Sequence, residues 1–332
     1  MNTIGKILTL TTFGESHGPA MGGVIDGMPA GVSIDMDRLQ RFVNRRRPGQ
    51  TAGASARDEK DKVEILSGLW QGKTLGTPIG FVVRNTDARS ADYEGIAACY
   101  RPNHADFTWE AKYGIRDPRG GGRASARETV ARVVAGGIAL QALQSLGITV
   151  SATIERVGKA TSDFEQEMAS AASQGDTLGG VISCKVCNVP VGLGEPAYGK
   201  LHAQLAAAMM SIPSVHGFEY GDGFGMASCR GSEVMDVFEK RADGTVGTSA
   251  NHSGGIQGGI SNGEDITMRI AFKPVPTLMR DVPTIDRDGN PVTLAARGRH
   301  DVCVINRALP VVESMAALVI LDNYLIRKTN VL

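Results

Sequence analysis

The sequence predicts a globular α/β protein in which strands and helices alternate along the chain, and three observations lead to this class. Apolar residues with strand-like alternation and with helical spacing both recur from end to end. The 332 residues can bury a sizeable core, and no run of Gly, Ser and Pro marks a linker. Glycine contributes 42 residues and aromatic side chains 17, a composition rich in tight turns and poor in stacking surfaces.

The apolar pattern predicts seven strands and four helices. The strands are Ile4–Thr12, Gly22–Asp26, Val63–Leu66, Ile79–Arg84, Ile148–Arg156, Val181–Val189 and Ile266–Phe272. The helices run from Asp35 to Arg47, Ser125 to Leu146, Tyr198 to Met210 and Leu309 to Arg327. Residues 49–60 lack apolar periodicity and are expected to form a loop, and the polar residues 161–175 a surface segment.

Two of the helices carry start signals. Asp35 precedes an apolar stripe at helical spacing, so its side chain can cap that helix. Ser125 and Glu128 have the spacing of a capping box. In that arrangement the serine oxygen accepts from the backbone N–H three residues on, and the glutamate reaches back.

A short pattern occurs twice along the chain. Gly22–Ile25 and Gly179–Ile182 both read Gly-Gly-Val-Ile, and each leads through a proline and a glycine to a predicted helix. The pattern indicates either a duplicated strand–turn–helix unit or chance in a glycine-rich chain.

The net charge of zero hides an uneven distribution. Residues 38–132 contain 18 basic and 11 acidic side chains, a net charge of +7, and 14 of the basic ones are arginine. Arginine captures carboxylate and phosphate in a bidentate manner, so this window suits a polyanionic small molecule. A solvated basic face is the alternative, and a nucleic-acid surface fits less well because stacking aromatics are few.

The turn Arg119–Arg123 before the helix at Ser125 is a candidate anion site. A helix start offers unpaired backbone N–H groups and partial positive charge, and glycines let a ligand approach closely. A plain capped helix with solvated arginines is the alternative. The spacing matches neither a P-loop nor a dinucleotide fingerprint.

Histidines in polar or glycine-rich loops are candidates for proton transfer. His17, His104 and His300 each lie beside Arg, Ser or Asp, and imidazole exchanges protons near neutral pH. His202 lies among leucines on a predicted helix and is expected to be a half-buried structural residue. Cys184 and Cys187 have no second pair, so no metal site is expected.

Composition also bears on location. No stretch reaches the ~18 apolar residues of a membrane-spanning helix, and Met1–Lys6 lack the apolar core of a signal peptide. The five cysteines are scattered and odd in number. We therefore expect a cytoplasmic protein that binds neither a membrane nor nucleic acid.

Several segments together resemble the chorismate synthase family. They are Gly14–Gly18 continuing to Asp26–Pro29, Arg45–Gly49, Gly122–Thr129, Lys273–Thr277, and Arg299–Asp301 continuing to Glu313. They occur in the family's order from residue 3 to about residue 325. The resemblance implies one domain over residues 1–332, in which antiparallel sheets sandwich helices, and a homotetramer. The Gly-Gly-Val-Ile repeat would suit that layout.

The resemblance also implies a reaction. The family removes phosphate and a ring hydrogen from 5-enolpyruvylshikimate 3-phosphate by anti-1,4-elimination, giving chorismate at the end of the shikimate pathway. The cofactor is reduced FMN (FMNH2), although there is no net redox change. The chain shows no added flavin-reductase segment, so an external flavin reductase is expected to supply the reduced cofactor, with NADPH only as an indirect reductant.

Residue roles follow from the same resemblance. His104 would protonate or neutralise the departing phosphate, His17 with Ser16 would transfer a proton at the flavin, and Asp301 would help remove the ring proton. Arg101 and Arg127 would bind substrate anions, and Arg46 would bind NADP or a substrate anion. The implied flavin contacts are Arg123, Ala124, Ser125, Pro213, Ser214, Gly258, Lys273, Pro274, Val275, Pro276, Thr277 and Arg299.

Four residues depart from the family pattern. Asn103 stands where glycine is usual, and Pro213-Ser214 replaces an Asn/Gln-Ala pair. Ala52 stands where many members have an arginine assigned to NADPH or substrate anions.

Two other function classes are open from the residues alone. One is an NADPH-consuming flavin reductase, which would oxidise NADPH without substrate. The other is a non-catalytic anion-binding scaffold, against which the presence of Ser16, His17, His104 and Asp301 argues.

Overall fold

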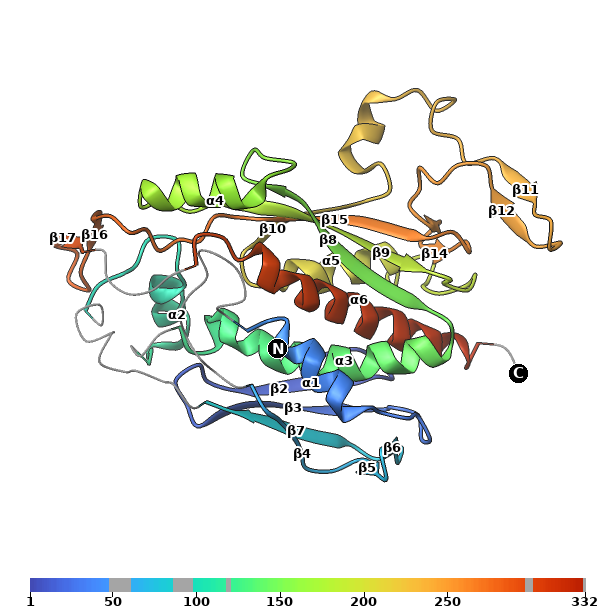
Figure 1. The fold of residues 1–332 in the computed structure, drawn as a ribbon, viewed down its shortest axis with the longest axis horizontal. Helices are drawn as coiled ribbons and strands as arrows, with labels where there is room; N and C mark the ends of the chain where they lie inside the picture. The colour runs from blue at the N-terminus through green and yellow to red at the C-terminus, as the bar shows by residue number, and fades with distance from the viewer. Residues whose placement is uncertain (48–60, 86–97, 118–120, 296–300, 331–332) are drawn as a thin grey trace.

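Two antiparallel sheets enclose a layer of helices (Figure 1). The computed structural model describes residues 1–47, 61–85, 98–117, 121–295 and 301–330. This arrangement is the mixed α+β sandwich expected from the family resemblance.

The first sheet is built from the N-terminal part of the chain. Its strand order is β1-β2-β3-β7-β4, and every neighbouring pair is antiparallel. The strands are β1 (Thr3–Ile4), β2 (Thr9–Gly14), β3 (Ala20–Asp26), β4 (Val63–Ile65) and β7 (Ile79–Arg84). One face of the sheet is buried against the helices, as the alternating burial along β7 indicates.

The second sheet lies on the opposite side of the helices, with strand order β10-β15-β9-β8, again antiparallel throughout. Its strands are β8 (Thr149–Val157), β9 (Gly180–Cys187), β10 (Val215–Tyr220) and β15 (Ile266–Phe272). Four short two-stranded hairpins are separate from the two main sheets. They are β5 (Leu69–Trp70) with β6 (Lys73–Thr74), β11 (Phe238–Lys240) with β12 (Val246–Thr248), β13 (Ile256–Gln257) with β14 (Ile260–Ser261), and β16 (Val282–Ile285) with β17 (Pro291–Leu294).

Four helices form the middle layer: α1 (Met36–Asn44), α3 (Thr129–Ser145), α5 (Leu201–Met210) and α6 (Ile305–Arg327). Helices α3 and α6 pack along each other at its centre, with α1 against α3 and α5 against α6. Two further helices, α2 (Asp106–Tyr113) and α4 (Phe164–Ser173), lie outside this layer (Figure 1). Among the described residues α6 alone is long and apolar enough to cross a membrane, and 78% of its apolar window is buried, as in a core helix.

The two halves of the chain share one topology. The first runs β2-β3-α1-β4-β7-α3 and the second runs β8-β9-α5-β10-β15-α6. Their sheets have the matching orders β2-β3-β7-β4 and β8-β9-β15-β10. The repeated Gly-Gly-Val-Ile pattern covers corresponding strands, β3 and β9. Equivalent position in an equivalent topology favours duplication over chance.

Two adjacent glycines let three helices approach closely. A Cβ placed on Gly136 of α3 would overlap the Cβ of Ser314 on α6. A Cβ on Gly137 would lie 2.5 Å from Leu39 Cδ1 of α1. Because glycine costs about 1 kcal/mol relative to alanine inside a helix, packing must offset its presence here.

Several predicted elements are confirmed and several need correction. Asp35 caps α1, its Oδ1 accepting from the Arg38 N–H at 2.9 Å. Ile4–Thr12 is not one strand but the hairpin β1–β2. Its turn is held because the Asp322 carboxylate of α6 accepts from three backbone N–H groups, those of Lys6, Ile7 and Leu8.

The predicted capping box at Ser125 is wrong. Ser125 Oγ accepts from the Arg127 N–H at 3.3 Å, and a 3-10 turn (Ala126–Glu128) precedes α3. Glu128 does not reach back because its carboxylate pairs with Arg132 at 3.0 Å.

Further differences concern element ends and elements that were not predicted. Helix α6 begins at Ile305 rather than Leu309, α5 begins at Leu201 rather than Tyr198, and the surface segment 161–175 contains helix α4. Strand β10, helix α2 and the four short hairpins were not predicted. The predicted loop 49–60 lies outside the described residues.

We expect Gly136→Ala to lower the free energy of unfolding by about 1–3 kcal/mol, the usual cost of overpacking a core. Helix propensity alone predicts the opposite sign. Urea unfolding of Gly136→Ala, of the double variant Gly136→Ala/Ser314→Gly, and of Gly231→Ala measures the effect. Ser314→Gly should restore part of the loss, and Gly231→Ala should be nearly neutral because no atom lies within 4 Å of its Cβ position. A stabilised Gly136→Ala variant would contradict the packing account.

Candidate functional site

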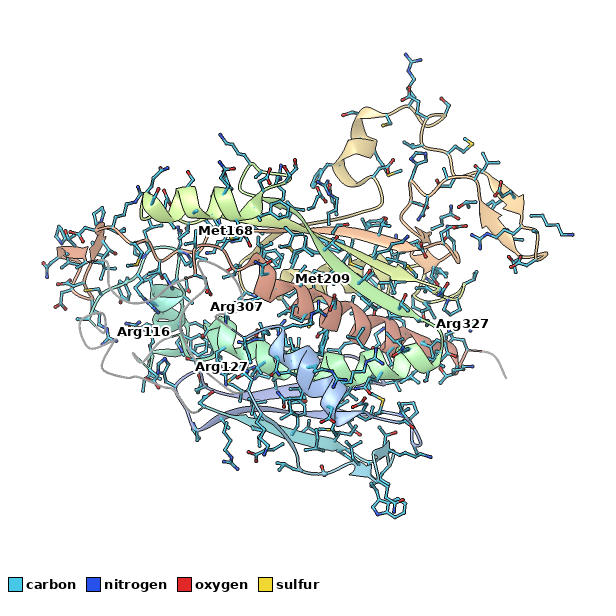
Figure 2. All side chains as sticks on the ribbon, viewed as in Figure 1. Arg116, Arg127, Met168, Met209, Arg307 and Arg327 are labelled. Atoms are coloured by element: carbon cyan, nitrogen blue, oxygen red, sulfur yellow. The ribbon has the colours of Figure 1, made fainter. Side chains whose placement is uncertain are left out.

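The helices α3 and α6 begin at the same end of the molecule, and the candidate residues gather there. Figure 2 shows Arg127 and Arg307 at this end, with Arg327 at the other end of α6. Helix starts carry partial positive charge, so this end favours anions before any side chain is considered.

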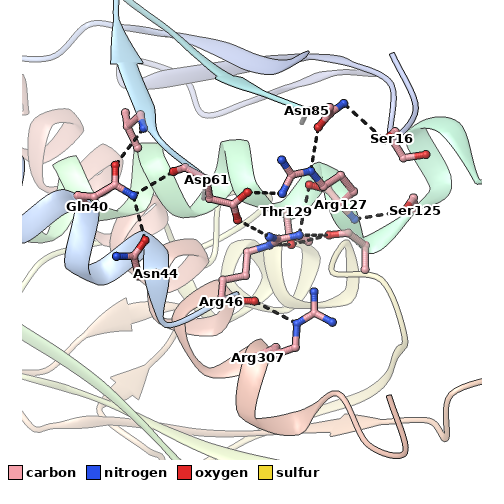
Figure 3. Close-up of polar contacts among 12 residues, drawn as sticks. Ser16, Gln40, Asn44, Arg46, Asp61, Asn85, Ser125, Arg127, Thr129 and Arg307 are labelled. Carbon is pink, nitrogen blue, oxygen red and sulfur yellow. Dashed lines mark hydrogen bonds and ion pairs between the residues drawn. The ribbon is translucent and has the colours of Figure 1, made fainter. Parts of the chain in front are cut away.

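A buried carboxylate joins two arginines at the centre of the cluster (Figure 3). Asp61 Oδ2 lies 3.1 Å from Arg46 Nη1, and Asp61 Oδ1 pairs with Arg127 Nη1. The three side chains are at most 5% exposed. Arg46 Nε also donates to Thr129 Oγ1 at 2.8 Å. The arrangement fixes two guanidinium groups in one orientation, because a buried charge must be paired and hydrogen-bonded.

Asn85 connects this cluster to the turn that carries Ser16 and His17. Its Oδ1 accepts from Arg127 Nε at 3.0 Å, and its Nδ2 donates to the Gly18 carbonyl at 2.8 Å. Ser16 and His17 are both buried. Within the part of the chain that the structure describes, no group hydrogen-bonds Ser16 Oγ. The hydroxyl is therefore positioned to meet a ligand.

Asp301 joins the cluster through Arg307. Arg307 Nη1 pairs with Asp301 Oδ2, and Arg307 Nε donates to the backbone carbonyl of Arg46 at 3.0 Å. The start of α6 has no side-chain cap, so Asp301 does not serve as its N-cap. The predicted site residues Asp301, Arg46 and Arg127 thus belong to one network.

The glycine turn before α3 adds Arg123 and Ala124, which ends a short 3-10 turn (Gly122–Ala124). Arg123 Nη2 donates to Thr12 Oγ1 at 2.7 Å, while its buried Nη1 has no hydrogen-bond partner among the described residues. Burial raises the pKa of nearby Glu15, an effect that the positive charge of Arg123 partly offsets.

His104 lies in a second group of residues with Lys273 and Thr277. Its Nδ1 lies 3.0 Å from the Pro102 carbonyl, and its Nε2 lies 3.4 Å from Thr277 Oγ1. Burial lowers the pKa of His104 to about 4, and the charges of Arg101 and Lys273 lower it as well. The imidazole is therefore neutral at pH 7 in the ligand-free protein.

Arg101 is held by Asp106 at the start of α2. Arg101 Nε and Nη2 each lie 2.7 Å from an Asp106 oxygen, and Arg116 lies 2.9 Å from the same carboxylate. Burial alone raises the pKa of Asp106, but hydrogen bonds from Arg101 and the charge of Arg116 outweigh it, so the pKa lies below its usual value. When a substrate anion binds, the Nε and Nη2 edge of the Arg101 guanidinium is therefore already paired with Asp106.

Hydrogen bonds to backbone carbonyls bring the two groups to the same end of the molecule. The Leu178 N–H donates to the Val302 carbonyl, next to Asp301, and Thr177 Oγ1 donates to the Val275 carbonyl. The Lys273 N–H donates to the Ser214 carbonyl at 2.8 Å. Two predicted flavin-binding segments therefore lie close to Asp301. They are Pro213-Ser214 and Lys273–Thr277, and the second includes Pro274, Val275 and Pro276.

Gly258 is not brought together with these residues. It lies in the β13–β14 turn, whose Gly259 carbonyl accepts from Leu201 N–H at the start of α5. Ser214 follows the end of the same ten-residue helix, which is ~15 Å long. The predicted flavin contact Arg299, and Ala52, lie outside the described residues.

Two of the departures from the family pattern occupy left-handed backbone. Asn103 has φ 58° and Ser214 has φ 72°. Asparagine tolerates this region better than most residues other than glycine, so Asn103 retains a glycine-like turn beside His104.

The residues that organise the cluster were not predicted from the sequence. Asp61 follows a polar stretch without periodicity, Asn85 follows the last residue of β7, and Arg307 falls before the predicted start of its helix. A polar side chain directly after a buried strand is the signal that could have marked Asn85. Among the described residues no group of three His, Cys, Asp or Glu side chains is placed to hold a metal. His202 is half-buried, as predicted, and stacks on Tyr220.

Known proteins resemble the chain over its whole length. A sequence model of the chorismate synthase family matches residues 8–325. The chain is 51% identical to chorismate synthase of Parabacteroides distasonis over 356 residues, covering 99% of each. It is 52% identical to that of Phocaeicola vulgatus over 355 residues, with the same coverage. A solved structure titled "Crystal Structure of Chorismate Synthase" superposes with a TM-score of 0.78 at 28% identity, covering 97% of this chain and 93% of that one.

The lowered pKa of His104 predicts a pH-dependent stability. The unfolded chain takes up the proton near pH 6.5 and the folded protein only near pH 4, so lowering the pH through this window favours unfolding. We expect the free energy of unfolding to fall by up to about 3 kcal/mol between pH 6.5 and 4 from this group.

Urea unfolding across this pH range tests the expectation on His104→Gln, with His216→Gln on β10 as the control. His104→Gln should reduce the slope of stability against pH, and His216→Gln, an exposed histidine, should retain it. An unchanged slope in His104→Gln would contradict the assignment.

Proposed function

Because the chain belongs to the chorismate synthase family, we propose that it converts 5-enolpyruvylshikimate 3-phosphate into chorismate and phosphate with the aid of reduced FMN. The chain is a carbon–oxygen lyase by this membership. The observation that carries the finer proposal is the pair of buried guanidinium groups, Arg46 and Arg127, fixed by Asp61 at the end where α3 and α6 begin.

The substrate's charges match this end of the molecule. It has two carboxylates and one phosphate, and the site has the guanidinium groups of Arg46, Arg123 and Arg127 with the ammonium of Lys273. Guanidinium donors bind carboxylate and phosphate in fixed geometry, which orients the ring as well as binding it.

The donors present suit a flavin phosphate and ring. Ser16 Oγ and Arg123 Nη1 are buried and have no hydrogen-bond partner among the described residues, as expected of groups that hydrogen-bond to a bound ligand. Arg123, Ala124 and Ser125 would hold the flavin together with Pro213-Ser214 and the Lys273–Thr277 segment. Reduced flavin held there would supply electron density transiently to the breaking C–O bond.

His104 would act on the departing phosphate. A phosphate dianion beside the imidazole adds negative charge, which raises the pKa of His104 from its ligand-free value of about 4. Proton uptake is then coupled to substrate binding, and Nε2, the ring nitrogen facing Thr277, is the atom that would present the proton.

Asp301 would accept the ring proton. Its pairing with Arg307 holds the carboxylate in place, and Arg307 is itself fixed by the Arg46 carbonyl. His17, with Ser16 beside it, would serve proton transfer at the flavin. General acid–base groups of this kind each contribute roughly 10²–10⁴ to a rate.

The assembly and supply of cofactor belong to the same proposal. We place the protein in the cytoplasm as a homotetramer that receives reduced flavin from an external flavin reductase, with NADPH acting only indirectly. Support for these statements comes from the family membership.

The direct test is anaerobic incubation of the protein with chemically reduced FMN and 5-enolpyruvylshikimate 3-phosphate. Equal amounts of phosphate and chorismate should form, with no net oxidation of flavin. A protein that instead consumes NADPH with FMN alone, measured by absorbance at 340 nm, would contradict the proposal in favour of a flavin reductase. Substrate binding without product would favour an anion-binding scaffold.

We expect Asp301→Asn to lower single-turnover chorismate formation by roughly 10²–10⁴ because the substitution keeps the shape and removes the basic oxygen. The Kd values for substrate and reduced FMN should change little. Asp176→Asn, which disturbs a surface pair with Arg280, is the matched control. Weakened binding with an unchanged rate would reduce Asp301 to a structural role.

A further inference from the structure

The side-chain amide of Asn85 contacts both Arg127 and the turn that carries Ser16 and His17. Asn85 follows β7, and its Nδ2 donates to the carbonyls of Gly18 at 2.8 Å, Glu15 at 3.1 Å and Ser16 at 3.4 Å. Its Oδ1 accepts from Arg127 Nε at 3.0 Å. One side chain therefore joins the turn that carries Ser16 and His17 to the arginine on Asp61 (Figure 3).

The orientation of this amide is fixed by chemistry. A guanidinium can only donate, and a backbone carbonyl can only accept, so the oxygen must face Arg127 and the nitrogen must face the turn. A carboxylate in the same place would keep the contact with Arg127 and would repel the carbonyls.

We infer that Asn85 is a positioning residue, which holds Ser16 and His17 in register with the substrate-binding Arg127. The inference rests on the proposed function, in which His17 and Arg127 act on one flavin–substrate complex. Asn85 itself contributes no proton and no charge. Its effect is to fix the separation between a proton-transfer group and an anion-binding group.

Asn85→Asp separates the two contacts that the amide makes. The contact with Arg127 survives, but the added negative charge beside Arg127 opposes anion binding, so substrate affinity should fall by no more than about tenfold. Because the turn loses its donors, kcat should fall roughly 10²-fold, the scale expected for a displaced reacting group. A purely structural role predicts a lower melting temperature with kcat unchanged.

The matched control is Asn188→Asp. Asn188 Nδ2 also donates to a backbone carbonyl, that of Gly147, at 3.0 Å. Gly147 follows the end of α3, which is ~25 Å from the start of that helix. Asn188→Asp should therefore keep wild-type kcat and KM. A loss in this variant equal to that in Asn85→Asp would overturn the inference.

A double-mutant cycle between Asn85→Asp and His17→Ala gives the decisive readout. If Asn85 acts by placing His17, the double variant should lose no more than about twofold beyond His17→Ala alone. Single-turnover phosphate release at high enzyme concentration makes the slow variants measurable. If the two losses multiply, Asn85 does not act through His17 and the inference is overturned.

The same experiment separates this inference from the proposed function. Wild-type protein that forms no chorismate would reject the function and the inference that rests on it. Active wild-type protein with an Asn85→Asp variant of equal kcat would reject only the inference.

Discussion

The buried Asp61 carboxylate between Arg46 and Arg127 is the interaction on which the site depends. Removing three charged groups from water costs several kcal/mol each unless they pair and form hydrogen bonds. Thr129, Asn85 and the Arg46 carbonyl with Arg307 extend the pairing into a connected network. Such a network fixes the guanidinium groups before a ligand binds, so the free-energy cost of ordering these side chains on binding is smaller.

The duplicated fold explains why these residues meet. Each half ends in a central helix, α3 or α6, and the two helices pack so closely that Gly136 tolerates no side chain opposite Ser314. Their starts lie at the same end of the molecule, with Arg127 in the 3-10 turn just before α3 and Arg307 in the first turn of α6 (Figure 2). The halves share a topology but contribute different chemistry, because the first supplies the anion-binding arginines and the second supplies Asp301.

Local signals in the sequence predicted the elements whose formation depends on residues nearby in the chain. The Asp35 cap, the long strands and the central helices follow from periodicity and capping alone. The turn after β1 could not be predicted, since its N–H groups bind Asp322, more than 300 residues away. Ser125 and Glu128 do not form the predicted capping box, because the Glu128 carboxylate pairs with Arg132. The family resemblance supplied the site residues, but their organisation by Asp61 and Asn85 needed the tertiary structure.

The central claim is that Asp61 matters by fixing two arginines, and Asp61→Asn tests it through the Kd for 5-enolpyruvylshikimate 3-phosphate measured by calorimetry. Asparagine suits the φ of 42° at this position, and circular dichroism would verify that the variant is folded. Removing a negative charge should by itself tighten binding of an anion. The account predicts the reverse, an affinity lower by at least about tenfold, because the guanidinium groups lose their orientation. Equal or tighter binding by the folded variant would contradict it.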